Sequence, residues 1–252
     1  MKEIVLNDGN KIPIIGFGTY KTTEQEGIQS IKNALEMGYR LIDTAAKYDN
    51  EKEVGKAINE SGIERKDIIV TTKLWRENLG YEETKKAFDK SLKTLGLDYI
   101  DLYLIHWPAN SKNYTNWQKA NADSWRALEE LQANGKIKSI GVSNFWQEHL
   151  EALFQTANII PAVNQIEFHP GYWQADLTAF CKKNSITIES WSPLARGKVF
   201  GNKVLQAIAK EHHKSISQIC LRWITQHETI AIPKSSTFHR IQENISIFDF
   251  KL

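Results

Sequence analysis

LYLIH, residues 102–106, is a run of apolar residues without the polar alternation of a half-exposed strand. A second run, IIVTTKL at 68–74, is likewise almost continuously apolar or β-branched. Parallel strands that are covered on both faces carry such continuous runs. These two stretches therefore predict an α/β protein whose parallel sheet is buried between other elements.

Further out from these runs, short β-type segments alternate with segments of helical periodicity. The predicted strands cover residues 14–18, 39–43, 68–74, 100–106, 137–143, 162–168, 186–191 and 229–233. The predicted helices include residues 24–38, 84–96, 124–135 and 215–227, three of them closed by Gly38, Gly96 and Gly135 as C-caps. The ends of the second to eighth strands recur every 24 to 41 residues, about one strand, loop and helix.

Eight such units in 252 residues predict a (β/α)₈ barrel, the TIM-barrel architecture, with an open doubly wound sheet as the alternative. No Pro- or Ser-rich linker interrupts the repeat, so residues 1–252 are expected to form a single domain. EIVLNDGNKIPII, residues 3–15, contains an Asp8-Gly9 turn signal. It predicts an N-terminal β-hairpin that caps one end of the barrel.

The composition excludes several classes of protein. A net charge of +2 with interspersed acidic and basic residues predicts no nucleic-acid surface. Neither a signal-peptide core nor an apolar run of membrane length is present, which predicts no membrane association and a cytoplasmic location. Cys181 and Cys220 are far apart and are expected to be buried small hydrophobes rather than a disulfide or a metal site.

Chemically active side chains gather where predicted strands end. Asp43 ends the second strand, Lys73 the third and His106 the fourth, and Tyr48 follows Asp43 in a loop. In a barrel the carboxyl ends of the strands share one face, and neighbouring strands are ~4.8 Å apart. We therefore expect these four side chains to reach one small volume.

Together these residue types suit proton delivery. A free phenol titrates near ~10, a neighbouring ammonium lowers that pKa, and a carboxylate keeps the ammonium charged. Asp43 would hold Lys73, Lys73 would tune Tyr48, and His106 would orient a carbonyl or share the proton. Taken singly, each has a plain structural explanation, such as a helix cap or a packing residue.

The motifs GFGTY, LIDTAAKYDNEKEVG, TTKLW, DLYLIHWP, IKSIGVSNF, NQIEFHP, SWSPLARG and IPKSSTFHRIQEN resemble the ordered motif set of the aldo-keto reductases. The resemblance runs from about residue 4 to 250 and is greatest to bacterial members similar to 2,5-diketo-gluconate reductase and prostaglandin F synthase. It implies NADPH-dependent reduction of small, sugar-derived or aromatic aldehydes and ketones to alcohols. Asp43, Tyr48, Lys73 and His106 match the catalytic four of the family, with Tyr48 as the general acid.

A nucleotide site is predicted after the last strand. GFGTY has no third glycine, so a Rossmann fingerprint is weak. Ser235, Ser236 and Thr237 are placed to cap a helix whose amides favour an anion, and Lys234 and Arg240 add positive charge. Barrel phosphate sites commonly lie in these loops, although a basic helix cap without a ligand is the simpler alternative.

By resemblance, NADP(H) is favoured and NAD(H) is a weaker alternative. The residues that would contact the cofactor are Gly18, Thr19, Tyr20, Asp43, Ser143, Asn144, Gln165, Trp191, Ser192, Leu194, Lys234, Ser235, Ser236, Thr237, Arg240, Glu243 and Asn244. Among them Trp191 would stack on the nicotinamide ring. Tyr20, Trp75 and Trp107 would line the substrate pocket beside Tyr48 and His106. The expected partner is a small carbonyl compound, and the chain is expected to act as a monomer.

Two features of the sequence bear on substrate specificity, and two functions other than carbonyl reduction are considered. The loop PANSKNYTNWQKANADSW, residues 108–125, is short, and the chain stops at Leu252, which together predict an open pocket. One rival is a cofactor-binding regulatory subunit with little turnover, which the complete set of four residues disfavours. The other is a metal-assisted hydrolase, which would need more His and Asp ligands at strand ends, so no metal is expected.

Overall fold

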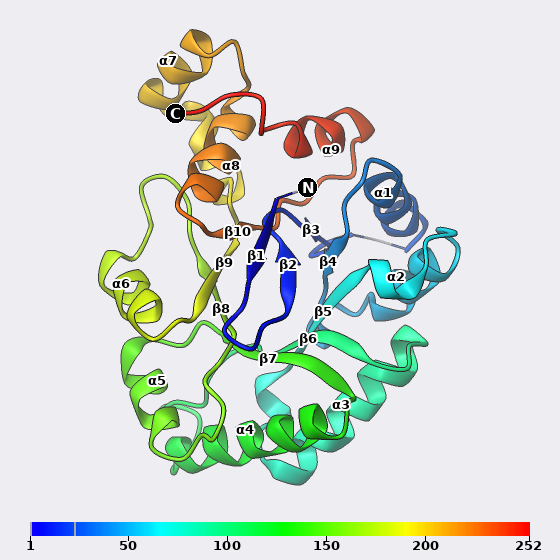
Figure 1. The fold of residues 1–252 in the computed structure, drawn as a ribbon, viewed down its shortest axis with the longest axis vertical. Helices are drawn as coiled ribbons and strands as arrows, with labels where there is room; N and C mark the ends of the chain where they lie inside the picture. Colours follow the sequence, from blue (N-terminus) through cyan, green and yellow to red (C-terminus); the bar gives the residue numbers. More distant parts are fainter. Residues whose placement is uncertain (1, 23) are drawn as a thin grey trace.

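The structure, a computed structural model, describes residues 2–22 and 24–252. Its centre is a curled sheet of eight parallel strands in the order β10-β9-β8-β7-β6-β5-β4-β3, ringed by helices (Figure 1). The strands are β3 (Phe17–Gly18), β4 (Leu41–Asp43), β5 (Ile69–Leu74), β6 (Ile100–Ile105), β7 (Ile137–Ser143), β8 (Val163–Glu167), β9 (Thr187–Trp191) and β10 (Ile230–Ala231). The predicted α/β class with eight parallel strands is confirmed.

Hydrogen bonds join the segment just before β3 to the last strand, β10. The amide of Gly16 donates to the carbonyl of Ala231 over 2.8 Å, and the amide of Ala231 donates to the carbonyl of Ile14 over 3.0 Å. A Cβ atom on Gly18 would lie 2.9 Å from the carbonyl oxygen of Ile232, so only glycine permits this approach. The two edges of the sheet therefore meet instead of facing solvent.

Helices lie around the outer face of the sheet, and the seventh packs against the eighth instead of on the sheet. They are α1 (Glu24–Glu36), α2 (Glu51–Asn59), α3 (Tyr81–Leu95), α4 (Trp117–Ala133), α5 (Gln147–Phe154), α6 (Ala175–Lys183), α7 (Lys203–Glu211), α8 (Ile216–Gln226) and α9 (Phe238–Ile245). Short 3₁₀ turns occur at Ala46–Tyr48, Arg65–Asp67, Arg76–Asn78 and Ala195–Gly201. Gly96 is the left-handed C-cap of α3, and Gly38 and Gly135 take positive φ just beyond α1 and α4.

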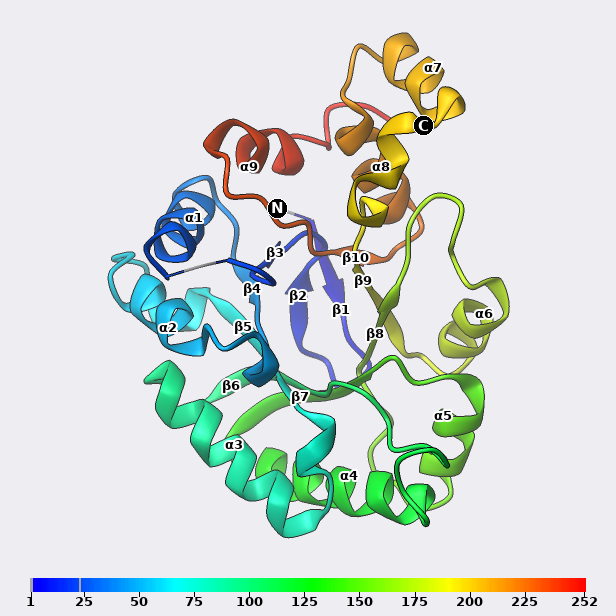
Figure 2. The same cartoon turned by 180° about the vertical axis from the view of Figure 1, so that it is seen from behind.

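The hairpin of β1 (Glu3–Val5) and β2 (Lys11–Pro13) is antiparallel, as predicted, with Val5 opposite Lys11. It lies across one end of the sheet in Figure 1 and behind the sheet in Figure 2. Its Asn10 side chain donates to the carbonyl of Lys138 and to Ser139, near the start of β7. The hairpin thus covers the amino ends of the strands, and the carboxyl ends are left for a site.

Two apolar layers hold the sheet. The larger layer lies between sheet and helices and includes Val70, Phe88 and Trp125. The smaller layer fills the inside of the curled sheet with residues such as Leu102 and Val163. Burying each such side chain contributes roughly 1.5–3 kcal/mol. Cys181 and Cys220 are buried and unbridged, as expected.

The structure corrects some predicted boundaries. Residues 108–125 are not all loop, because α4 begins at Trp117, where Asn116 caps the helix by accepting from the amide of Lys119. Its polar first turns hide the helix from a search for apolar periodicity. The strand predicted at 229–233 is only Ile230–Ala231. Within residues 2–22 and 24–252, no helix has the length and apolar character needed to cross a membrane.

Candidate active site

The carboxyl ends of β4, β5 and β6 bring the four predicted catalytic residues together. Asp43 is the last residue of β4, Lys73 lies one residue before the end of β5, and His106 directly follows β6. Tyr48 ends a 3₁₀ turn that folds back over β4 from the following loop. The three strands are neighbours in the sheet, so their ends converge.

Lys73 is the centre of this group. Its ammonium nitrogen donates to both carboxylate oxygens of Asp43 over 2.8 and 2.7 Å, to the carbonyl of Thr44 over 2.8 Å, and to the phenol oxygen of Tyr48 over 3.4 Å. The Lys73 side chain is 0% exposed and that of Asp43 2%. Gln165 fixes the carboxylate further by donating to Asp43 over 2.9 Å.

The electrostatics keep Lys73 charged and Tyr48 protonated. Burial alone would lower the pKa of Lys73, but the neighbouring Asp43 carboxylate and Tyr48 raise that pKa above its ordinary value. Burial raises the pKa of Tyr48, and Lys73 offsets only part of this rise. The net shift of Tyr48 is therefore opposite to the one expected from Lys73 alone, because desolvation of the phenolate outweighs the attraction of the ammonium. A protonated phenol at neutral pH can act as an acid.

His106 is a neutral imidazole. Its burial, together with the positive charge of Lys73, lowers its pKa to about 2. Its ring centre lies 5.6 Å from that of Tyr48 and 5.3 Å from that of Trp75. An uncharged His106 can orient a carbonyl oxygen by a hydrogen bond, but it does not hold a second proton, so the orienting role is favoured over proton sharing.

These residues open into a pocket of about 380 Å³. Aromatic side chains form much of its wall, and its lining includes Tyr20, Tyr48, Trp75, Trp107 and Trp191. The Tyr20 ring lies 4.9 Å from that of Tyr48, and both Tyr20 and Trp107 are exposed at the rim. The predicted substrate residues thus surround the phenol on one side of the pocket.

The opposite wall is fixed by a chain of polar contacts. Trp191 donates its indole N–H to the amide oxygen of Asn144 over 2.9 Å. The Asn144 amide nitrogen donates to the carbonyl of His106 and to the hydroxyl of Ser143, each over 3.0 Å. Ser143 in turn donates to the carbonyl of Gln165 over 2.9 Å. Asn144 therefore positions Trp191 and His106 relative to each other.

A second hollow of about 760 Å³ continues from the pocket. Both are lined by Tyr20, Ser192, Pro193, Arg196 and Lys234. The cleft extends to the start of α9, where its lining includes Leu194, Ser235, Arg240, Glu243 and Asn244. Pocket and cleft together form an elongated site with a reactive end and a basic end.

The basic end suits an anion. Within residues 2–22 and 24–252, neither Lys234 nor Arg240 forms an ion pair with a carboxylate. Thr237 is the N-cap of α9, but its side chain makes no capping bond, and Ser235 accepts from the Thr237 amide instead. A helix N-terminus next to two cations attracts a phosphate group.

Some predicted cofactor residues have structural partners. Thr19 is fully buried and bonds the carbonyl of Asp43 through both its amide and its hydroxyl, so it braces β3 against β4. Ser236 and Thr237 lie at the start of α9 without lining the cleft. Glu243 lines the cleft while accepting a 2.6 Å bond from Ser215. Gly18 borders the pocket.

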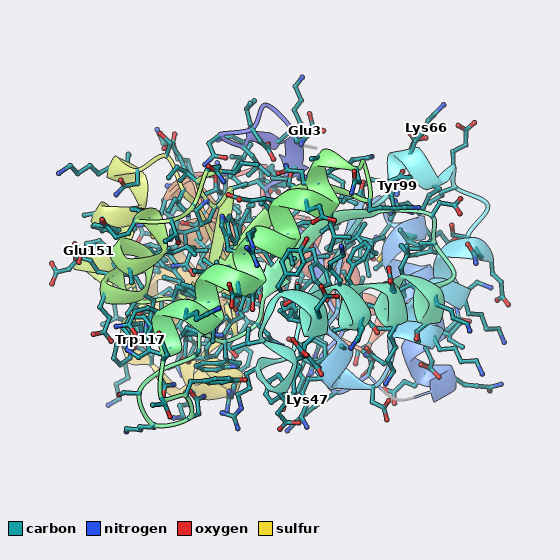
Figure 3. All side chains as sticks on the ribbon, turned by 90° about the horizontal axis from the view of Figure 1, so that it is seen from below. Glu3, Lys47, Lys66, Tyr99, Trp117 and Glu151 are labelled. Carbon is teal, nitrogen blue, oxygen red and sulfur yellow. The ribbon has the colours of Figure 1, made fainter. Side chains whose placement is uncertain are left out.

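Two further cations line the pocket and were missed in the sequence. Lys47 immediately precedes Tyr48, and its ammonium lies 5.1 Å from the centre of the Trp75 ring. Arg196 follows β9 and lies 5.8 Å from the Trp191 ring. Their place beside predicted site residues was the available signal. In Figure 3, Lys47 lies at the end of the molecule opposite Glu3 and Lys66.

The described part of the chain contains no group of three or more His, Cys, Asp or Glu residues placed to hold a metal ion. The polar groups at the reactive end are the phenol of Tyr48, the imidazole of His106 and the amides of Asn144 and Gln165.

Comparisons with known proteins agree with this geometry. A sequence model of the Aldo/keto reductase family matches residues 14–252. The glyoxal reductase of Bacillus subtilis (strain 168) is 49% identical over 250 residues, which are 99% of this chain and 88% of that protein. An aldo/keto reductase from Brucella melitensis has a crystal structure with a TM-score of 0.94 and 49% identity, covering 100% of this chain and 95% of that one. A Bombyx mori aldo-keto reductase solved in complex with NADP has a TM-score of 0.91 and 38% identity, covering 100% and 89%.

Proposed function

The chain belongs to the aldo/keto reductase family, and we propose that it is an NADPH-dependent oxidoreductase that reduces aldehydes or ketones to alcohols with Tyr48 as proton donor. The observation that carries this proposal is the buried Asp43–Lys73 pair held against Tyr48, at a pocket that continues into a basic cleft. We also propose that the curled sheet, joined at Gly16 and Ala231, is the closed (β/α)₈ barrel of this family.

The cleft fits a phosphorylated dinucleotide. Lys234 and Arg240 lack carboxylate partners in the described part of the chain, so they are available to a 2′-phosphate, which favours NADPH over NADH. Trp191, fixed by Asn144, offers a flat face for the nicotinamide at the pocket end. NADPH, when bound, supplies a hydride to the carbonyl carbon.

The side chains supply the proton and the orientation. Tyr48 gives its proton to the carbonyl oxygen as that oxygen gains negative charge. Lys73 stabilises the phenolate that remains, and Asp43 keeps Lys73 charged and in place. Neutral His106 donates a hydrogen bond that orients the carbonyl toward Tyr48. The aromatic wall limits access of water to this exchange.

Pocket size and lining favour small substrates. A volume of about 380 Å³ with Trp75 and Trp107 at its wall suits small aliphatic or aromatic carbonyl compounds. Because a relative is a glyoxal reductase, glyoxal is the first compound to test, followed by benzaldehyde and an aldose sugar.

The test uses the purified chain with each carbonyl compound and NADPH. The proposal predicts loss of nicotinamide absorbance that depends on both substrates, with NADH supporting a slower rate. Cofactor binding is measured separately by quenching of tryptophan fluorescence. Binding without turnover of any compound would favour the regulatory-subunit alternative, and absence of both binding and turnover would refute the proposal.

A further inference from the structure

Glu189 is a carboxyl group buried inside the sheet, directly below the site. It is the third residue of β9, paired in register with Gln165 of β8 and Ile230 of β10. Alternate residues of a strand share a face, so Glu189 points to the same side as Trp191, one layer deeper. The residue is 0% exposed.

The side chain of Glu189 lacks the partners that a buried carboxylate requires. Neither of its oxygens accepts a hydrogen bond of full geometry from the residues that the structure describes. The Gln165 amide, which donates to Asp43, also acts on Glu189 and lowers its pKa, but it does not offset the effect of burial. The charged groups that act on it are Asp43, which repels an ionised Glu189, and Lys73, which attracts it. Lys73 already directs its hydrogen bonds to Asp43, to the carbonyl of Thr44 and to Tyr48. Burying an unpaired ionised carboxylate is strongly unfavourable, so the neutral acid is preferred.

The charges in this volume balance only when Glu189 keeps its proton. Lys73 contributes one positive charge and Asp43 one negative charge. A second ionised carboxylate would leave a net negative charge away from water. Burial and the nearby Asp43 raise the pKa of Glu189 to about 8, although Lys73 opposes the shift.

We propose that Glu189 is a positioning residue that remains an uncharged carboxylic acid at neutral pH. An uncharged Glu189 does not offset the positive charge that Lys73 presents to Tyr48. This role rests on the proposed function, because it acts on the phenol that donates the proton. Glu189 touches neither substrate nor cofactor. Its effect passes through Lys73, whose ammonium it attracts when ionised.

The direction of the effect follows from the charges. When Glu189 loses its proton to solvent in alkaline solution, the added negative charge near Lys73 disfavours the Tyr48 phenolate and raises the pKa of Tyr48. The wild-type phenol therefore keeps its proton to higher pH than it would beside a permanently neutral side chain. Carbonyl reduction, which needs the protonated phenol, persists further into alkaline solution.

Glu189→Gln supplies the permanently neutral side chain, and Glu51→Gln is the matched control. Glu51 is also a buried glutamate with a raised pKa, but it accepts a 2.6 Å bond from Thr72 and has Lys90 as its charged neighbour. The rate of NADPH-dependent reduction of an active carbonyl substrate is measured from pH 6 to 11 for all three proteins. The reverse oxidation of the product alcohol is measured over the same range.

Glu189→Gln is expected to keep its neutral-pH kcat within about threefold. The alkaline fall of reduction, which needs the protonated phenol, and the rise of oxidation, which needs the phenolate, should both move to lower pH by about half a unit or more. Glu51→Gln is expected to leave both limbs where they are in the wild type. An unchanged alkaline limb in Glu189→Gln, or an equal shift in Glu51→Gln, would overturn the proposal.

Two readouts without activity test the protonation itself. The infrared C=O band of a protonated carboxylic acid at pH 7 should be present in the wild type and lost in Glu189→Gln. Folded Glu189 holds a proton that the unfolded chain has released above about pH 4.5, so wild-type stability falls as pH rises toward 8. The Tm of Glu189→Gln relative to wild type should therefore increase over this range.

These measurements distinguish failure of the proposed reductase function from failure of the proposed role of Glu189. A protein that shows the infrared band and the widening Tm difference but reduces no carbonyl would contradict the proposed function and, with it, the role of Glu189 toward Tyr48. Active enzyme without the band, or with a Tm difference that does not widen, would contradict only the neutral Glu189.

Discussion

An aspartate, a lysine and a tyrosine meet at each end of the sheet. At the carboxyl ends of the strands, the Lys73 ammonium lies 2.7 Å from Asp43 and 3.4 Å from the phenol oxygen of Tyr48. The lysine side chain is 0% exposed. All three side chains border or underlie the aromatic pocket, and the phenol oxygen faces the ammonium.

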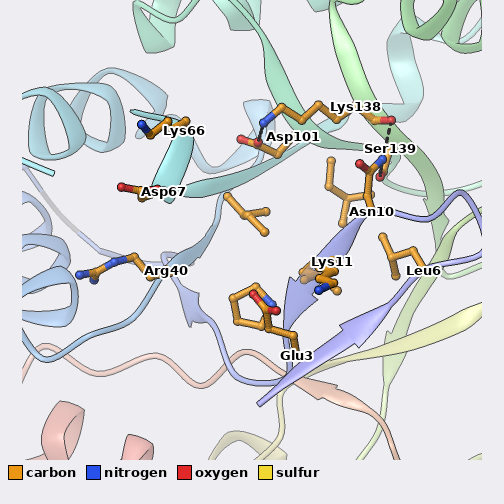
Figure 4. Close-up of a pocket in the computed structure, with 14 residues that line it drawn as sticks. Glu3, Leu6, Asn10, Lys11, Arg40, Lys66, Asp67, Asp101, Lys138 and Ser139 are labelled. Carbon is orange, nitrogen blue, oxygen red and sulfur yellow. Dashed lines mark hydrogen bonds and ion pairs between the residues drawn. The ribbon is translucent and has the colours of Figure 1, made fainter. Parts of the chain in front are cut away.

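At the hairpin end, the Lys138 ammonium lies 2.9 Å from Asp101 (Figure 4). The same ammonium lies 4.3 Å from the centre of the Tyr99 ring. Its side chain is 43% exposed. Asp101 also accepts from Arg65 over 2.6 Å and from the amide of Val70 over 3.0 Å. The pocket beside this group has a volume of about 380 Å³, similar to that of the reactive pocket.

The same three residue types occur in both groups, so residue type alone does not define a proton donor. The Lys138 side chain is 43% exposed, so solvent screens its charge, although its ammonium lies 4.3 Å from the centre of the Tyr99 ring. The Lys73 side chain is fully buried, and its ammonium lies 3.4 Å from the phenol oxygen of Tyr48. Burial, not proximity alone, gives the Lys73 group its chemistry.

The largest expected difference comes from removing each lysine. Lys73→Met leaves Asp43 buried and unpaired, which should lower the free energy of unfolding by about 3–5 kcal/mol, and reduction should slow by at least about 10²-fold. Lys138→Met removes an exposed partner and should cost about 0–1 kcal/mol with unchanged kcat. Denaturant unfolding and steady-state rates measure both, and similar losses in the two variants would remove the distinction.

Arg240 tests the far end of the active cleft. Arg240→Ala should raise the Kd for NADPH by about 10- to 100-fold, because a charged hydrogen bond to the 2′-phosphate is lost. The Kd for NADH should stay within about twofold, since NADH lacks that phosphate. Arg65→Ala at the hairpin end is the control and should change neither constant. An equal increase of the Kd for NADPH and for NADH in Arg240→Ala would mean that Arg240 does not bind the 2′-phosphate.

Acid sensitivity tests the neutral imidazole of the site. The pKa of folded His106 is about 2, whereas an unfolded histidine titrates near its ordinary value of 6.5, so the unfolded chain binds the extra proton first. Stability should therefore fall as pH decreases below about 6.5, by up to about 1.4 kcal/mol per pH unit from this residue. His106→Gln should remove that part of the slope, and His239→Gln, at an exposed position, should not. Parallel stability curves for wild type and His106→Gln would contradict a neutral His106.

Much of the fold and part of the site follow from the sequence. Continuous apolar runs such as LYLIH predict buried parallel strands, and once strand ends share a face, Asp43, Lys73 and His106 must approach each other. The placement of Tyr48 near them came from the same reasoning.

Other features depend on the three-dimensional packing and have no signal in the sequence. Thr19 lies within a site motif, but its hydroxyl is used against the Asp43 carbonyl, a contact that no pattern reveals. The net rise in the pKa of Tyr48 depends on its depth of burial, which spacing does not give. Asp101, Lys138 and Tyr99 also lie at the ends of neighbouring strands, like Asp43, Lys73 and Tyr48. The exposure of the lysine side chain distinguishes the two groups, and the sequence does not show it.

The most direct test compares the two tyrosines. Tyr48→Phe and Tyr99→Phe each remove one phenol oxygen from an aspartate–lysine group, and carbonyl reduction and the Kd for NADPH are measured on the same preparations. Tyr48→Phe should lose at least about 10³-fold in kcat with a nearly unchanged Kd, whereas Tyr99→Phe should keep both values. Retained turnover in Tyr48→Phe, or equal loss in the two variants, would contradict the assignment of Tyr48 as the proton donor.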